Sequence, residues 1–136
     1  MELPKDSDVV LLLCEDARLE VGNKITLLGM YAGDDISVWS EEDEKNIGAL
    51  TFVILIKGKS GKFRAVFEIR KPDKSSFIRH EFGDIEKPAA GAAVPILKFS
   101  PFFVEQYGEY LVILSLDGRE YIRAFTIRKG EGAAPR

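Results

Sequence analysis

Hydrophobic and polar residues alternate along much of this chain, and turn-forming residues interrupt the alternation about every ten positions. Residues 63–70 are the clearest case, because Phe63, Phe67 and Ile69 fall on one side and Arg64 and Arg70 on the other. Successive side chains of a strand point to opposite faces, so this spacing gives one buried and one solvated face. Long stretches with helical periodicity are absent. The pattern predicts an all-β chain.

The expected strands cover residues 8–20, 24–31, 36–39, 50–56, 63–70, 77–82, 94–99, 111–116 and 119–128. Gly22-Asn23 and Asp117-Gly118 predict tight hairpin turns, because these residues tolerate a positive φ. The apolar, β-branched run at 50–56 predicts a central strand. Pro95 has no N–H for a ladder, so the strand that contains it is expected at a sheet edge.

Seven to nine short strands in 136 residues favour a two-sheet antiparallel sandwich over one open sheet. The step Gly108-Glu109-Tyr110 is typical of the tyrosine that opens the penultimate strand of immunoglobulin-like sandwiches. We therefore expect a single immunoglobulin-like domain over residues 1–128, followed by a flexible C-terminal tail over residues 129–136.

The composition excludes disorder as the main state, because 46% of residues are hydrophobic and can build a core. No stretch approaches the roughly 20 apolar residues of a membrane span, and the start of the chain is acidic where a secretory signal is basic. Cys14 is the only cysteine, which excludes an internal disulfide and indicates a reducing compartment. We expect a cytoplasmic protein with no membrane partner.

The net charge of −3 conceals an uneven distribution. Residues 1–50 hold twelve acids and four bases, a sum of −8, whereas residues 51–136 hold fifteen bases and ten acids, a sum of +5. Two interpretations stay open. The molecule has an acidic and a basic face that steer a charged partner or drive self-association, or strands from the two parts interleave and the charges mix.

Catalytic and cofactor motifs fail on inspection. Cys14 ends an apolar run, which indicates a buried, unreactive thiol, and His80 lies in a polar stretch typical of an exposed strand. Asp16 is either paired with Arg18 on the same strand face or a proton-transfer or binding carboxylate. Residues 57–60 lack the glycine and the following helix of a phosphate loop. We expect no enzyme and no cofactor.

Metal and nucleic acid are also not expected as ligands. Asp34, Asp35 and the acids at 41–44 offer oxygens to calcium, but without the spacing of a calcium-binding loop. One cysteine and one histidine do not make a zinc site. The chain is acidic overall and contains no recognised nucleic-acid-binding module.

Six residues are candidates for an interaction surface. Phe99, Phe102 and Phe103 form an apolar, proline-broken loop beside the expected edge strand, which either caps the core or binds a protein partner. Trp39, Asp34 and Asp35, together with Tyr31, would suit a carbohydrate or a lipid headgroup instead. We expect a non-enzymatic module that binds a protein partner or itself, and keep ligand binding by the second group as the alternative.

The chain also resembles a known family in its opening segment. Leu13-Cys14-Glu15-Asp16, a hairpin and then the run from Lys24 to Tyr31 are similar to the start of a family of small bacterial proteins described only as a domain of unknown function. The likeness spans the first quarter of the chain and continues weakly into Tyr107-Gly108-Glu109-Tyr110. The resemblance implies a small bacterial cytoplasmic protein and brings no catalytic residues.

Overall fold

The computed structural model describes residues 2–39 and 45–131. Apart from one short 3-10 turn, η1 (Asp6–Asp8), every regular element of these residues is a strand. The strands are β1 (Val9–Glu20), β2 (Lys24–Met30), β3 (Asp35–Val38), β4 (Asn46–Ile47), β5 (Leu50–Ile56), β6 (Gly61–Arg70), β7 (Ser76–Lys87), β8 (Ile96–Phe99), β9 (Phe102–Phe103), β10 (Gly108–Leu116) and β11 (Arg119–Lys129). The prediction of an all-β chain is therefore confirmed.

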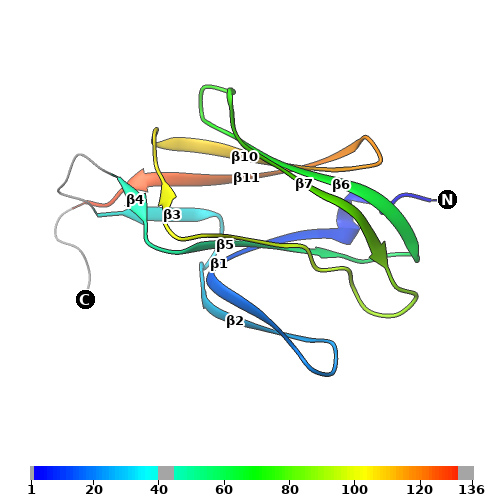
Figure 1. The fold of residues 1–136 in the computed structure, drawn as a ribbon. Helices are drawn as coiled ribbons and strands as arrows, with labels where there is room; N and C mark the ends of the chain where they lie inside the picture. The colour runs from blue at the N-terminus through cyan, green and yellow to red at the C-terminus, as the bar shows by residue number, and fades with distance from the viewer. Residues whose placement is uncertain (1, 40–44, 132–136) are drawn as a thin grey trace.

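The strands form two larger sheets and a small one (Figure 1). The order is β2-β1-β5-β8 in the four-stranded sheet, β3-β11-β10-β6-β7 in the five-stranded sheet and β4-β9 in the third. As predicted, β5 is central and the strand after Pro95 lies at an edge. The expected count of seven to nine strands is too low, because the two-residue strands β4 and β9 are too short to leave a periodic signal.

The expectation of a purely antiparallel arrangement is also wrong at one pair. β3 runs parallel to β11, with Thr126 opposite Asp35. The cause is a change of sheet: the chain leaves β2 at one edge of the four-stranded sheet and enters β3 at the edge of the other sheet. A strand that arrives by such a crossing is not constrained by a hairpin to run antiparallel.

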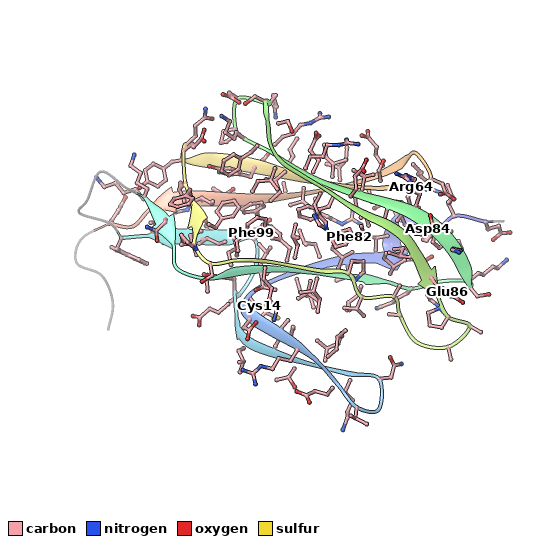
Figure 2. All side chains as sticks on the ribbon, in the orientation of Figure 1. Cys14, Arg64, Phe82, Asp84, Glu86 and Phe99 are labelled. Atoms are coloured by element: carbon pink, nitrogen blue, oxygen red, sulfur yellow. The ribbon has the colours of Figure 1, made fainter. Side chains whose placement is uncertain are left out.

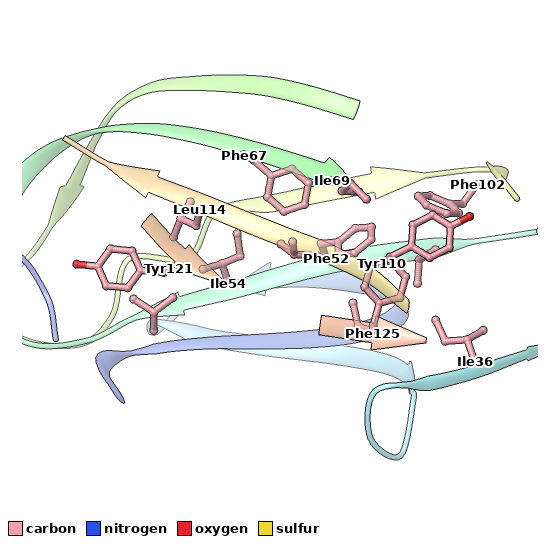
Figure 3. Packing of buried hydrophobic residues seen from close by; sticks show 14 of the residues in the cluster. Ile36, Phe52, Ile54, Phe67, Ile69, Phe102, Tyr110, Leu114, Tyr121 and Phe125 are labelled. Atoms are coloured by element: carbon pink, nitrogen blue, oxygen red, sulfur yellow. The ribbon is translucent and has the colours of Figure 1, made fainter. Parts of the chain in front are cut away.

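The main core lies between the inward faces of the two larger sheets (Figure 3). Phe52 of β5 lies at its centre, and its ring packs edge-to-face on Phe67 and Phe125 of the opposite sheet, with centroids 5.5 and 5.6 Å away. Aromatic pairs at such distances and angles add to the free energy gained from burial alone. Phe52 therefore joins both sheets.

β1 changes partner along its length. Residues 9–14 pair with β5, whereas residues from Cys14 to Glu20 pair with β2. At the change, Gly29 has a φ of 61°, and a Cβ there would lie 2.8 Å from the Glu15 side chain. Only glycine meets both demands without strain. Beyond this point the hairpin of residues 15–30 extends away from the packed sheets (Figure 1).

β7 contains two irregularities in its pairing with β6. The register shifts opposite Ala65–Val66 and again opposite Ile69–Arg70, leaving Phe82 and Phe77 as the extra residues. Phe82 packs on Phe67, and Phe77 packs on Phe102 of the core. The shifts are β-bulges that turn two phenylalanines inward from a sheet edge, and Figure 2 shows Phe82 between the two layers.

The expected tyrosine contact is present. The hydroxyl of fully buried Tyr110 donates to the backbone carbonyl of Gln106 at 2.6 Å, four residues upstream. β11 extends to Lys129, one residue beyond the predicted domain end. Residues 132–136 of the expected flexible tail lie outside the described residues. The acids at 41–44 also lie outside them.

Candidate ligand groove

The structure divides the predicted interaction loop between core and surface. Phe102 is 1% exposed, and Phe99 packs on both Phe52 and Phe102. Figure 2 shows Phe99 pointing into the space between the sheets. Phe103 alone stands out, with 55% of its surface exposed. Phe99 and Phe102 therefore cap the core, whereas Phe103 stays on the surface.

The second group of predicted residues is also divided. Trp39 packs against Gly130, and its indole Nε1 donates to the carbonyl of Glu131 at 3.3 Å. Asp35 forms an ion pair with Arg128 at 2.7 Å, Nε to Oδ1. Asp34 and Tyr31 lie together in a different place, the groove described below. Trp39 therefore anchors the end of β11 and does not join Tyr31 in one site.

The candidate nucleophile and base lie apart. Cys14 is fully buried in a second apolar cluster with Ala17 and Val53, on the face of the four-stranded sheet turned away from the main core (Figure 2). Its thiol donates to the backbone carbonyl of Asp16 at 3.2 Å, and burial raises the pKa of the thiol. His80 is exposed on β7 of the other sheet and packs edge-to-face on Phe82. The predictions of a buried thiol and an exposed histidine are confirmed.

Asp16 takes part in ion pairs, as one of the two interpretations of this residue predicted. Its carboxylate lies 2.9 Å from Lys98 Nζ and 3.7 Å from Arg18 Nε. The hydrogen bond and charge of Lys98 lower the pKa of Asp16. The carboxylate is thus paired between β1 and β8.

A hollow opens between two strand edges that are left partly unpaired. The pairing of β2 with β1 ends at Cys14, and the Tyr31 N–H still donates to the Leu13 carbonyl, so residues 9–12 of β1 have no strand partner on that side. β3 pairs only with residues 126–129 of β11, which leaves residues 119–125 free along the corresponding edge of the other sheet. A pocket of about 660 Å³ opens between these two edges. We call it the edge groove.

The walls of the edge groove are mostly apolar. Six of its ten lining residues are aliphatic or methionine: Leu11, Leu12, Leu13, Met30, Ile122 and Ala124. The other four are Tyr31, Gly33, Asp34 and Arg123. The volume falls within the roughly 300–1,000 Å³ of ligand pockets, which are typically apolar with a few polar groups.

Backbone groups also face the groove. The carbonyls of Val9 and Leu13 accept from Arg123 and from the Tyr31 N–H, so odd-numbered residues of β1 direct their polar groups to this edge. Leu11 therefore does the same, because the N–H and C=O of alternate strand residues point the same way. On β11 the Thr126 N–H donates to the Asp34 carbonyl at 2.7 Å. Ala124 and Ile122 are two and four positions before Thr126, so their backbone N–H and C=O groups point toward the same edge. The groove thus combines apolar walls with donors and acceptors at its edges.

The sequence pattern did not point to this groove as a whole. Tyr31 and Asp34 were predicted as ligand contacts, but Leu11, Ile122 and Ala124 carry no local signal that separates them from core residues. Their role follows from where β2 and β3 end on their partners, which depends on long-range register. The Gly29 position was the one available hint, since a glycine inside a strand marks a bulge or close approach.

The described parts of the chain contain no group of three or more His, Cys, Asp or Glu residues placed to hold a metal ion. In residues 2–39 and 45–131, no helix has the length and apolar character needed to cross a membrane.

Comparison with known proteins finds a structural likeness at low sequence identity. No family model matches the chain, and no curated protein matches it significantly. Among solved structures, the chain is similar to the Pseudomonas fluorescens alkylpurine DNA glycosylase AlkC bound to DNA containing an abasic site analogue, with a TM-score of 0.42 and 13% identity. The match covers 89% of this chain but 30% of that chain. The resemblance to a bacterial family of unknown function stays a prediction.

The structural comparison contradicts two expectations. We expected a module for protein partners or self-association, with carbohydrate or lipid headgroups as the alternative, and no nucleic-acid partner; the similar structure is a DNA glycosylase on DNA. The exclusion of nucleic acid rested on net charge, which does not determine the potential of a single face. We withdraw both expectations, and a likeness of TM-score 0.42 supports no assignment in their place.

Proposed function

We propose that this chain is an immunoglobulin-like β-sandwich that binds a small hydrophobic molecule in the edge groove. The observation that carries the proposal is the apolar pocket of about 660 Å³ between the unpaired edges of β1 and β11. A hydrophobic guest would remove Leu11, Ile122 and Met30 from water, at about 25 cal/mol for each Å² of apolar surface buried. Both strands are held by their other neighbours, so the walls exist before a ligand arrives.

The tyrosine contact supports the immunoglobulin-like assignment. The hydrogen bond from Tyr110 to Gln106 joins the start of β10 to the segment before it, as the tyrosine of such sandwiches does. Tyr110→Phe should therefore lower the free energy of unfolding by about 1 kcal/mol in chemical denaturation. An unchanged free energy of unfolding would contradict a stabilising role of the Tyr110 hydrogen bond.

The groove is tested with N-phenyl-1-naphthylamine, a neutral probe whose fluorescence rises in apolar surroundings. We expect saturable binding of one probe per chain. Ala124→Phe, which fills the groove, should abolish binding, whereas Ala89→Phe, on an exposed connector, should leave it unchanged. Equal binding by the wild type and by Ala124→Phe would refute the site.

We further propose that the chain is not an enzyme and works in the cytoplasm. The separation of Cys14 from His80, which lie on different sheets, supports the first point. The single free, buried thiol supports the second. Mass spectrometry of a bound molecule after incubation would detect turnover, and cell fractionation would detect export.

A further inference from the structure

The charged groups around the edge groove are unequally satisfied. All four terminal N–H groups of Arg123 donate hydrogen bonds within the protein. Nη1 donates to the Asp6 carboxylate at 3.1 Å and to the Ile122 carbonyl at 2.7 Å. Nη2 donates to the carbonyls of Asp6 and Val9, both at 2.7 Å. Its charge is paired and its donors are used, so Arg123 acts as a structural clamp between β1 and β11 and does not attract a ligand anion.

Asp34 is in the opposite situation. Its backbone carbonyl accepts from the Thr126 N–H, which fixes the residue beside β11, and the residue is exposed and lines the groove. Its neighbour Asp35 is neutralised by Arg128, but Asp34 forms no ion pair with any residue that the structure describes. The groove therefore carries one uncompensated negative charge on its wall.

Tyr31 lies three residues before Asp34 and is half-buried in the same groove. Burial raises the pKa of its hydroxyl, and the nearby Glu15 carboxylate raises it further. The phenol stays neutral, so its ring offers a face to which a cation is attracted.

We propose that the ligand of the edge groove is a cationic amphiphile, a primary ammonium group on a hydrocarbon body. The ammonium lies between the Asp34 carboxylate and the Tyr31 ring, and the hydrocarbon lies along Leu11, Met30 and Ile122. This inference rests on the proposed function and adds the charge of the ligand to it. An anionic amphiphile would meet the Asp34 charge while the only cation of the groove, Arg123, is already paired among the described residues.

The test is competition against N-phenyl-1-naphthylamine by decylamine, decanol and decanoate, which share a chain length and differ in charge. We expect decylamine to displace the probe at a concentration roughly threefold to fivefold lower than decanol, the size of an exposed ion pair. Decanoate should be weaker than decanol. Added salt should reduce the advantage of decylamine over decanol.

Two matched variants locate the charge. Asp34→Asn should abolish the advantage of decylamine while decanol still displaces the probe, which also shows that the variant is folded. Asp84→Asn makes the same change of charge on β7, at the opposite edge of the five-stranded sheet from β3, and should keep the advantage.

The outcomes separate the two proposals. Equal displacement by decylamine and decanol, or an advantage that survives in Asp34→Asn, would overturn the cationic ligand and leave the hydrophobic groove standing. If the probe does not bind to the wild type at all, both proposals fall.

Discussion

Several single residues that look functional in the sequence have a structural task. Trp39 is the example with the clearest geometry, because its indole covers Gly130 so closely that a Cβ at that position would overlap the ring. The Gly130 N–H also donates to the Val38 carbonyl at 2.8 Å. The tryptophan thus holds the end of β11 against β3, and it needs glycine opposite it.

Gly130→Ala should therefore force the Trp39 ring out of its place. We expect a loss of about 1–3 kcal/mol in the free energy of unfolding, as for other overpacked sites, and a shift of the tryptophan emission, since Trp39 is the only tryptophan. Gly48→Ala is the control, because nothing lies within 4 Å of the added Cβ. Identical emission spectra for Gly130→Ala and the wild type would contradict the contact.

Cys14 is the second such residue. Its pKa is raised, first by burial and then by the Asp16 charge, so the thiol stays protonated at neutral pH. Iodoacetamide should label native protein far more slowly than protein unfolded in urea, measured as mass gain over time. Rapid labelling of the folded chain at pH 7 would contradict the buried position.

Between elements, the turn after β6 is tied to the segment before β10 through one carboxylate. Asp73 Oδ2 accepts from Gln106 Nε2 at 2.7 Å, and Oδ1 accepts from the Ser75 N–H at 2.9 Å. The hydrogen bonds from Ser75 and then Gln106 lower the pKa of Asp73 to about 2. Because Gln106 also accepts from Tyr110, this carboxylate supports the start of β10.

The lowered pKa predicts a loss of stability in acid. A carboxyl group with a folded pKa of about 2 and an ordinary value of 3.8 contributes fully above pH 3.8. The contribution falls as the pH drops from there toward about 2. Urea midpoints measured across this window should decline in the wild type more steeply than in Asp73→Asn. Parallel declines would show that Asp73 is not linked to folding.

Local signals predicted most elements but not their irregularities. The Asn23 and Asp117 turns and the central strand β5 are confirmed, because positive-φ residues and apolar β-branched runs act over a few positions. The sequence predicts that this strand ends at Phe82, but β7 continues to Lys87. Gly83 does not end the strand, because it forms part of a bulge. A bulge is set by the opposing strand, which a local pattern does not contain.

At the scale of the whole molecule, the two parts of opposite charge meet in ion pairs. Four ion pairs join an acid of the first fifty residues to a base of the remainder: Glu2–Lys59, Asp6–Arg123, Asp16–Lys98 and Asp35–Arg128. The strands themselves do not interleave, because β2 and β1 lie together at one side of the four-stranded sheet and β3 lies at an edge of the five-stranded sheet. The edge groove needed the same long-range information, and so the sequence predicted two of its polar residues but not its walls.

The shared core predicts where a truncation should cost most. Phe52→Ala removes a ring that contacts both sheets and should cost about 3–5 kcal/mol in the free energy of unfolding. Phe103→Ala deletes the same side chain at a position that is 55% exposed and should change stability by less than about 1 kcal/mol. Similar urea midpoints for the two variants would contradict the central position of Phe52 in the core.

Contacts between the segment before β1 and the strand β11 join parts of the chain that are synthesised far apart in time. The Tyr121 hydroxyl donates to the Pro4 carbonyl, and Arg123 binds Asp6, in each case across 117 positions of sequence. While the ribosome is still adding the intervening residues, the apolar side of β1 has no β11 to pack against. The apolar residues of β1 that face the core therefore stay exposed until β11 has been synthesised.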